Sequence, residues 1–254
     1  MPEVIAMKKS MIILISFLLL FTRCNKESAT GGPSSTGAGG STARFTIIGN
    51  FLYVVDNTSL KAFDISNTGA APVLKSTTNV GINIETIFPY QDKLFIGSSF
   101  AMHIFSLTDP QRPVKLAQAD YIVRMSCDPV VAKDSTAYAT LNSSGPCGGG
   151  GSQLVVYDIK DITKPLLKQT LPLNGPHGLG ISDSALYVCD GTFGLNVYNI
   201  RNTYAPQLLR TIQGETFYDV IPYGNILICQ VATGIVLYDI STRHQPVFLS
   251  RILN

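Results

Sequence analysis

Short apolar runs separated by small polar residues recur along most of the chain. From residue 44 onward the runs hold about four to seven residues, and Gly, Asn, Asp and Ser, which are typical of turns, fill the gaps between them. No part of this region keeps apolar residues at the spacing of about 3.6 residues that an amphipathic helix needs. The pattern predicts an all-β protein built from short antiparallel strands.

One kind of segment returns five times. Each copy has an aromatic residue, a short polar turn and a proline, and the copies are FDISNTGAAP (63–72), FSLTDPQRP (105–113), YDIKDITKP (157–165), YNIRNTYAP (198–206) and YDISTRHQP (238–246). Their aromatic residues are spaced by 42, 52, 41 and 40 residues. A pattern with several matched points at a nearly constant period indicates a repeat architecture.

Each repeat contains four apolar runs. In the fourth repeat these are HGLGI, ALYVCD, the run that ends at Tyr198, and QLLRTI after the proline. Four short antiparallel strands in about 41 residues make one propeller blade. We therefore predict a five-bladed β-propeller of four-stranded antiparallel blades over residues 44–254. No extra strand is left to complete a blade across the two ends, so ring closure is expected to depend on blade packing alone.

Two repeats carry the fullest version of the pattern. They read LYVCDG (186–191) followed by GLNVYNI (194–200), and GIVLYDIS (234–241). These segments resemble the LVIVD-repeat family, whose blades carry patterns such as LYVADG and GLRVYDIS. The resemblance covers residues 44–254 and implies an extracytoplasmic β-propeller, but it brings no established activity and no catalytic residues. WD40 repeats fit less well, because the chain contains no Trp.

The acidic residue after the repeat aromatic has two interpretations. Asp64, Asp158 and Asp239 could bind calcium, or each could accept hydrogen bonds from backbone N–H groups in an Asx turn. The fourth repeat has Asn199 at this position, and an amide oxygen serves an Asx turn well but is a poorer ion ligand. We expect Asx turns that join the third and fourth strands.

The N-terminal region has the form of an export signal. Two lysines precede MIILISFLLLF (11–21), an apolar run as long as the core of a signal peptide and about half the length of a membrane-spanning helix. We interpret residues 1–23 as a signal peptide, with Met7 as the expected start of translation. Residues 25–43 are nearly all Gly, Ser, Thr and Ala, which predicts a flexible tether.

Cys24 lies at the junction between this signal and the tether. LFTRC (20–24) resembles the cleavage box of bacterial lipoproteins, in which the cysteine becomes the lipid-modified first residue, although Arg23 stands where a small residue is usual. Residues 24–43 are then a lipidated cysteine and its tether. The resemblance implies a membrane partner through the lipid anchor, at a bacterial membrane, and Lys26-Glu27 favours the outer membrane or cell surface. The alternative is ordinary secretion, in which Cys24 has no role.

Composition narrows the classes of partner. The net charge is +2, and the basic residues are scattered rather than clustered, which argues against nucleic acid as a partner. The absence of Trp lowers the expectation of a sugar-binding groove, because Trp often forms its flat apolar platform. No feature of the sequence indicates a cofactor, and no residue is assigned as catalytic.

Four other cysteines divide into two pairs. Cys189 and Cys229 occupy what looks like the same strand position in adjacent repeats, so both are expected in the core, with a disulfide between them left open. Cys127 stands at the start of the first strand of the longest repeat, and Cys147 lies within the glycine-rich NSSGPCGGGG (142–151) between its second and third strands. Antiparallel strand order puts both on one face of the propeller, and in an oxidising compartment we expect them to form a disulfide.

The same face is expected to collect the polar residues at the starts of the innermost strands and at the end of one second strand. These candidate ligand-face residues are Glu85, Asp128, His177, Asp190 and Asp219. Carboxylates and an imidazole that converge on a channel can bind a cation or a basic ligand, so a metal site stays open. The simpler interpretation is a solvated channel mouth.

Three functions remain open at this stage. The first is a binding or scaffolding module that uses the face around Cys127 and Cys147 to hold an envelope protein or glycan. The second is a glycan-active hydrolase, which needs carboxylates about 5 to 10 Å apart at the channel. The third is a purely structural envelope protein, whose sign would be a channel mouth plugged by the protein's own side chains.

Overall fold

A computed structural model describes residues 40–121, 129–143 and 151–253. Within these ranges the chain forms twenty β-strands in five sheets, and no helix. Accordingly, no helix in the described part of the chain is long and apolar enough to cross a membrane. Each sheet contains four strands in chain order, and every pair of neighbours is antiparallel. The predicted five four-stranded blades are confirmed.

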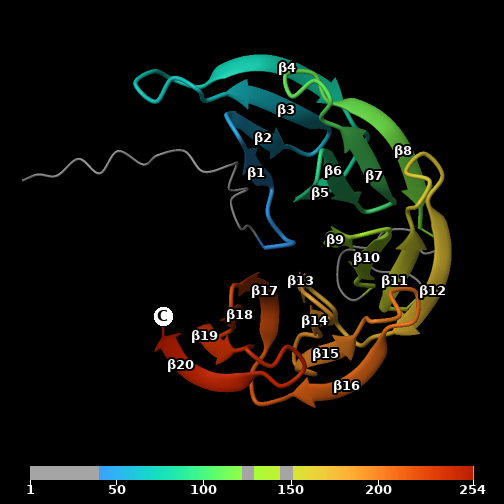
Figure 1. The fold of residues 1–254 in the computed structure, drawn as a ribbon, viewed down its shortest axis with the longest axis vertical. Helices are drawn as coiled ribbons and strands as arrows, with labels where there is room; N and C mark the ends of the chain where they lie inside the picture. Colours follow the sequence, from blue (N-terminus) through green and yellow to red (C-terminus); the bar gives the residue numbers. More distant parts are fainter. Residues whose placement is uncertain (1–39, 122–128, 144–150, 254) are drawn as a thin grey trace, which may run out of the picture. The chain divides into compact units, whose positions relative to one another are not determined.

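The blades follow one another along the chain and are arranged around a common centre, with the first strand of each innermost (Figure 1). Blade 1 contains β1 (Phe45–Ile48), β2 (Phe51–Val55), β3 (Ser59–Asp64) and β4 (Val73–Asn79). Blade 2 contains β5 (Ile84–Tyr90), β6 (Lys93–Ser98), β7 (Ala101–Ser106) and β8 (Val114–Asp120). Blade 3 contains β9 (Val130–Lys133), β10 (Thr136–Leu141), β11 (Gln153–Asp158) and β12 (Leu166–Pro172).

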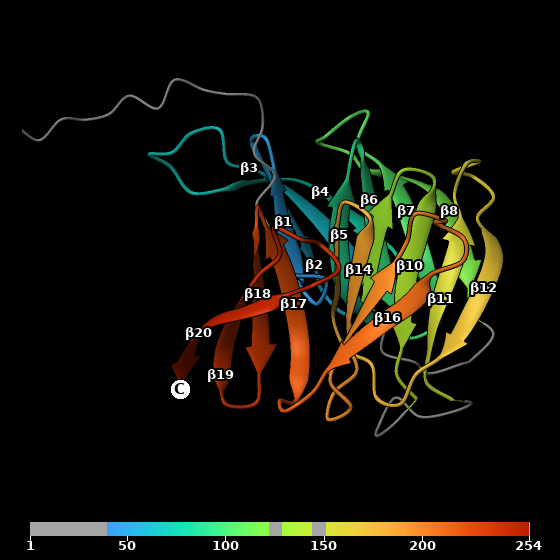
Figure 2. The same ribbon diagram turned by 60° about the horizontal axis from the view of Figure 1, so that its bottom comes forward.

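The last two blades have the same construction. Blade 4 contains β13 (Leu179–Ser182), β14 (Ala185–Cys189), β15 (Leu195–Asn199) and β16 (Gln207–Ile212). Blade 5 contains β17 (Phe217–Tyr223), β18 (Ile226–Val231), β19 (Gly234–Asp239) and β20 (Val247–Leu253). Because the strands run up and down between two ends, the turns collect on two faces (Figure 2). We call the face with the links between blades and the turns between second and third strands the connection face, and the opposite one the turn face.

Local geometry repeats with the blades. The turn between the first and second strands places one residue at a positive φ of 52° to 58° in every blade: Gly49, Gln91, Asp134, Asp183 and Gly224. A bulge precedes the repeat aromatic on every third strand, as between Val197 and Tyr198. The predicted Asx turns are confirmed, since the backbone N–H groups two residues on donate to the side chains of Asp64, Asp158, Asn199 and Asp239.

Neighbouring blades pack face to face through apolar residues. We call the side of each blade that meets the next blade its trailing face. In blades 1 to 4 the second strand carries a fully buried aromatic residue on this face: Tyr53, Phe95, Tyr138 and Tyr187. The side that receives it, the leading face, carries an aliphatic residue and the repeat aromatic. These pairs are Leu94 and Phe105, Ala137 and Tyr157, Leu186 and Tyr198, and Leu227 and Tyr238. Burial of these surfaces joins the blades.

Three tyrosines of the trailing faces also bond to the next blade. The hydroxyl of Tyr187 donates to the Arg243 carbonyl at 2.6 Å, and those of Tyr138 and Tyr53 donate to the carbonyls of Thr203 and Pro110. Each carbonyl lies in the turn between the third and fourth strands of the following blade. A buried tyrosine hydroxyl needs such a partner, so these bonds set how successive blades dock.

The structure corrects one assignment of equivalent positions. Cys189 and Cys229 are both fully buried and both free, so the predicted core location is confirmed and they form no disulfide. Their strand positions differ, however. Tyr198 pairs with Leu186 and Tyr238 pairs with Leu227, which makes Cys229 the counterpart of Val188 rather than of Cys189. A shift of one residue turns a side chain to the other face of its blade, so the two thiols lie on facing blades in one apolar cluster.

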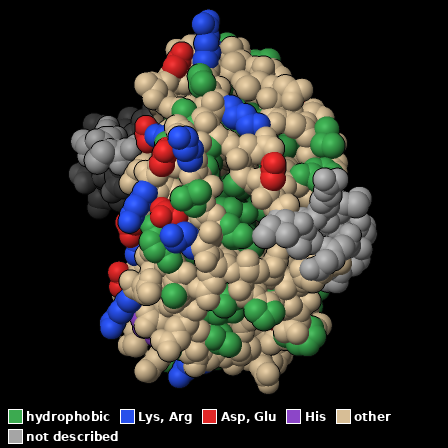
Figure 3. Space-filling model, turned by 90° about the vertical axis from the view of Figure 1, so that its right-hand side faces the viewer, with side chains coloured by type: hydrophobic (Ala, Val, Ile, Leu, Met, Phe, Trp, Pro, Cys, Tyr) green, Lys and Arg blue, Asp and Glu red, His purple; other side chains and the backbone are tan. Residues whose placement is uncertain are grey.

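The outermost strands are largely exposed. Hydrophobic side chains lie scattered among polar ones on the side shown in Figure 3, and Lys, Arg, Asp and Glu side chains collect along one edge of that view. Val114, Leu166 and Leu208 are examples of apolar residues at the starts of these strands that remain at least half exposed. Single exposed apolar residues of this kind are normal on a protein surface.

Candidate functional site

Residues 40–43 cross the centre of the propeller. The hydroxyl of buried Ser41 donates to Asp219 at 3.3 Å and accepts the backbone N–H of Leu179 at 2.7 Å. The hydroxyl of Thr42 donates to the other oxygen of Asp219 at 2.6 Å. The carbonyl of Ala43 accepts the N–H of Ile87 at 2.9 Å. This segment, which the sequence places at the end of the tether, therefore links blades 2, 4 and 5 from inside.

Asp219 is the centre of this contact. Two glycines leave no room for a side chain beside it, since a Cβ at Gly40 or at Gly178 would lie 2.0 Å from a carboxylate oxygen of Asp219. Burial raises the pKa of the Asp219 carboxyl above its ordinary value of 3.8, although hydrogen bonds from Thr42, Val220 and Ser41 act in the opposite direction.

This raised pKa predicts a pH-dependent stability. A carboxyl whose pKa is higher in the folded state than in the unfolded state stabilises the fold at low pH, and this contribution is lost as the pH rises through the folded pKa. Asp219→Asn removes the titration. The free energy of unfolding of the Asp219→Asn variant, minus that of the wild type, should therefore increase from about pH 4 to about pH 7.

Urea unfolding of both proteins at the two pH values measures this gain. Hydrogen bonds lost in the variant shift its stability by the same amount at both pH values, so they do not affect the comparison. A stability difference that stays constant across the pH range would contradict the predicted titration of Asp219.

Asp190 and His177 lie on the connection face of blade 4. The carboxylate of Asp190 is 2% exposed and accepts the N–H groups of Asn174 and Gly175 at 3.0 and 2.8 Å, with the side-chain amides of Asn174 and Asn196 on its other oxygen. Its oxygens are thus bonded by the protein itself. The ring of His177 stands edge-on to Tyr218 at 5.3 Å, and burial lowers its pKa, against the nearby charge of Asp190.

Glu85 belongs to a different group of contacts, on blade 2. It occupies a bulge of β5, its carboxylate accepts the hydroxyl of Ser99 at 3.0 Å, and burial raises its pKa. Among the described residues, no three His, Cys, Asp or Glu side chains are grouped so that they could hold a metal ion. Asp128, the expected Cys127–Cys147 disulfide and Cys24 lie outside the described residues.

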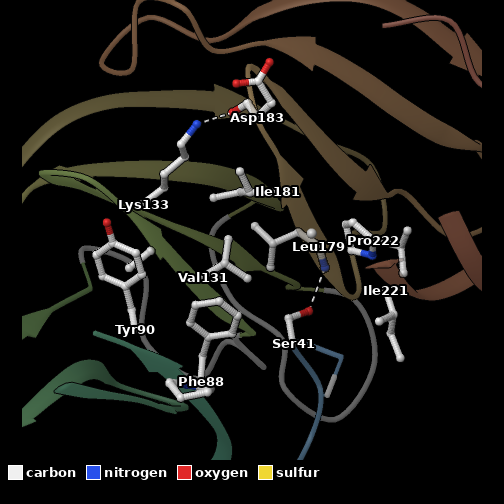
Figure 4. Close-up of a pocket in the computed structure, with 14 residues that line it drawn as sticks. Ser41, Phe88, Tyr90, Val131, Lys133, Leu179, Ile181, Asp183, Ile221 and Pro222 are labelled. Carbon is white, nitrogen blue, oxygen red and sulfur yellow. Dashed lines mark hydrogen bonds between the residues drawn. The ribbon is translucent and has the colours of Figure 1, made fainter. Parts of the chain in front are cut away.

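The channel contains a cavity of about 360 Å³ on the side of residues 40–43 that is nearer the turn face (Figure 4). Its walls are apolar side chains of four innermost strands, among them Phe88, Val131, Ile181 and Ile221. Ser41 lines its inner end, so the segment of residues 40–43 separates it from the candidate ligand face. At the outer end lie Tyr90, Lys133 and Asp183, where Lys133 donates to the carbonyl of Asp183.

This cavity was not predicted from the sequence. The innermost strands were predicted, but which of their residues point into the channel depends on strand register and on the distance between blades. Register places Val131 on the trailing face of blade 3 and Ile181 on the leading face of blade 4, and both also line the cavity, so alternation along the strands gave no signal for it. A mostly apolar cavity of this size with a few polar groups at one end is a usual form of ligand site.

Solved structures with a similar fold share little sequence with this chain. A protein from Lactobacillus plantarum matches with a TM-score of 0.64 and 10% identity, over 80% of this chain and 68% of its own. The periplasmic gluconolactonase PpgL of Pseudomonas aeruginosa matches with a TM-score of 0.60 and 14% identity, over 80% and 67%. The computationally designed Ika8 protein matches with a TM-score of 0.57 and 14% identity, over 80% of this chain and only 59% of its own. No protein with a curated description matches the sequence.

The fold and these likenesses define a β-propeller protein. Residues 39–80, which include the whole first blade, match the LVIVD repeat. The resemblance to LVIVD repeats is thereby confirmed for the first blade, and the chain is a five-bladed β-propeller that contains an LVIVD repeat.

Proposed function

We propose that the protein is a binding or scaffolding module of the bacterial cell envelope, which holds its ligand or partner at the central cavity on the turn face. The observation that carries this proposal is the division of the channel. Residues 40–43 cross the channel and bond to its innermost strands, and the turn-face side of this segment keeps an apolar cavity of about 360 Å³. The cavity suits an apolar group, either a small molecule or a side chain of a partner protein, with polar contacts from Tyr90 and Lys133 at its rim.

Anchoring at a membrane is part of the proposal. The signal peptide expected over residues 1–23 and the lipidated Cys24 would hold the propeller at a bacterial membrane, on the outer membrane or cell surface, through the Gly- and Ser-rich tether. A propeller held in this way can present its turn face to envelope components.

A glycan-active hydrolase is less well supported. Such an enzyme needs two carboxyl groups that face the substrate, one as an acid and the other as a base or nucleophile. Asp190 and Asp219 accept hydrogen bonds from the protein's own backbone and side chains, so neither is free to take that role. The likeness to PpgL is one of fold at 14% identity.

Site-specific photo-cross-linking in the cell envelope tests the proposal. A benzoylphenylalanine in place of Tyr90 places the probe at the rim of the cavity, and one in place of Phe193 places it on the connection face, where Phe193 is 52% exposed. We expect a specific cross-linked product at position 90 and none at position 193. A product only at position 193 would move the binding surface to the face near Cys127 and Cys147. Cross-linking at neither position would support the structural alternative.

A further inference from the structure

Two blade faces of this chain lack a neighbour. Blades 1 to 4 each cover their trailing face with the leading face of the next blade, which leaves the leading face of blade 1 and the trailing face of blade 5 at the two ends of the row (Figure 1). No apolar cluster of described residues joins these two ends. Among the described residues these two sheet faces therefore have no partner, whereas faces of the same type are buried between the other blades.

The trailing face of blade 5 is apolar and open. Strand register places Ile221, Tyr223, Ile226, Ile228 and Ile235 on this side of the blade. Tyr223 is 65% exposed, and Ile226 and Ile235 are exposed by more than a third. Ile228 stands where the preceding blade has Tyr187, and a hollow of about 170 Å³ lies beside it. The hollow is lined by Ile221 and Ile235 and, toward the connection face, by Asp219 and Gln230. The last trailing face thus lacks the aromatic residue that fills this space in blades 1 to 4.

The leading face of blade 1 has the residues that fit such a face. Leu52 and Phe63 occupy the positions of Leu186 and Tyr198, which are buried against blade 3. Here Leu52 and Phe63 remain partly exposed, and Phe45 and Ile47 beside them are exposed by 59% and 37%. The four internal interfaces show that a leading face and a trailing face of this chain are complementary.

Within one copy, the described contacts hold both end blades in place without joining their two end faces. The guanidinium of Arg44 donates to the carbonyl of Ile84, which fixes the start of blade 1 to blade 2. Ser41 and Thr42 bind Asp219 of blade 5 from inside the channel, so the chain before blade 1 lies against blade 5 in that position.

We propose that the trailing face of blade 5 binds the leading face of blade 1 of a second copy. The contact repeats the interface between blades within the chain, with Leu52 and Phe63 of one copy against Ile226, Ile228 and Ile235 of the other. Such a contact is heterologous, so each pair keeps one free face of each kind and further copies can join. This assembly is independent of the cavity on the turn face.

Complementary blocked variants test the proposal. The first carries Ile226→Glu and Ile235→Glu on blade 5, and the second carries Phe45→Glu and Ile47→Glu on blade 1. All four residues are exposed in a single copy, so the fold should tolerate the changes, which circular dichroism checks. The matched control carries Val114→Glu and Leu166→Glu, two residues of outermost strands that are at least as exposed as the four test residues.

Sedimentation velocity of the purified full-length chain in a mild detergent gives the readout. The wild type and the control should associate as concentration rises. Each blocked variant alone should associate at least about tenfold more weakly, because a carboxylate would have to be desolvated in the contact. An equimolar mixture of the two blocked variants should form a 1:1 dimer and nothing larger, since each supplies the intact face that the other lacks. A monomeric wild type, or a mixture that stays monomeric, would overturn the proposal.

Discussion

Gly194→Ala should lower the free energy of unfolding by about 2 to 5 kcal/mol, the combined cost of backbone strain and overpacking. Gly194 immediately precedes β15 and has a φ of +108°, a conformation that an L side chain rarely adopts. A Cβ there would lie 2.4 Å from the carbonyl oxygen of Ile212, which is backbone of the neighbouring strand and cannot move aside like a side chain. Chemical unfolding of the purified variant measures the loss.

Gly224→Ala is the matched control. Gly224 also has a positive φ, +58°, but no atom lies within 4 Å of the position that its Cβ would take. Its replacement should therefore cost only the conformational strain, about 1 to 2 kcal/mol. Equal losses for the two variants would mean that the contact with Ile212 does not determine the need for glycine at position 194.

Asp190→Ala should lower the free energy of unfolding by about 2 to 4 kcal/mol, because it leaves buried donors without an acceptor. The carboxylate accepts the backbone N–H groups of Asn174 and Gly175, which hold the link between blades 3 and 4. A ligand-binding role for Asp190 predicts the opposite pattern, in which stability is retained and binding is lost. Thermal and chemical unfolding separate the two.

Asp239→Ala provides the comparison for this change. Asp239 makes the same type of bond, from the N–H of Ser241, but in an exposed turn. Solvent can replace the lost acceptor there, so the cost should stay near about 0.5 kcal/mol. Equal losses of free energy of unfolding in the two variants would mean that the burial of Asp190 does not determine its contribution to stability.

The contrast between Asp190 and Asp239 shows which hydrogen bonds of aspartates could be predicted from the sequence. The repeat placed Asp239, Asp158 and Asp64 in Asx turns correctly, because that bond lies within three residues along the chain. Asp190 and Asp219 were expected on an open ligand face instead. Their partners come from residues 174–175 and 41–42, and a contact between distant segments has no local signature.

Strand register also limits what can be predicted from the sequence. The repeat located Cys229 in the core but misplaced it by one residue relative to Cys189, since the first residue of a strand cannot be read from composition to that accuracy. The positive φ at Gln91, Asp134 and Asp183 was equally hidden, because these turns share a conformation and not a residue type.

By itself, the sequence determined the all-β class, the five four-stranded blades and the Asx turns, because each depends on alternation, spacing or hydrogen bonds inside one repeat. Only the tertiary structure decided that Ser41 and Thr42 bond to Asp219 inside the channel and that a cavity remains on the turn-face side of them. It also decided that, among the described residues, blades 1 and 5 end in apolar faces with no partner. These features depend on how the blades are placed around the centre, and that placement follows from packing between residues far apart in the chain.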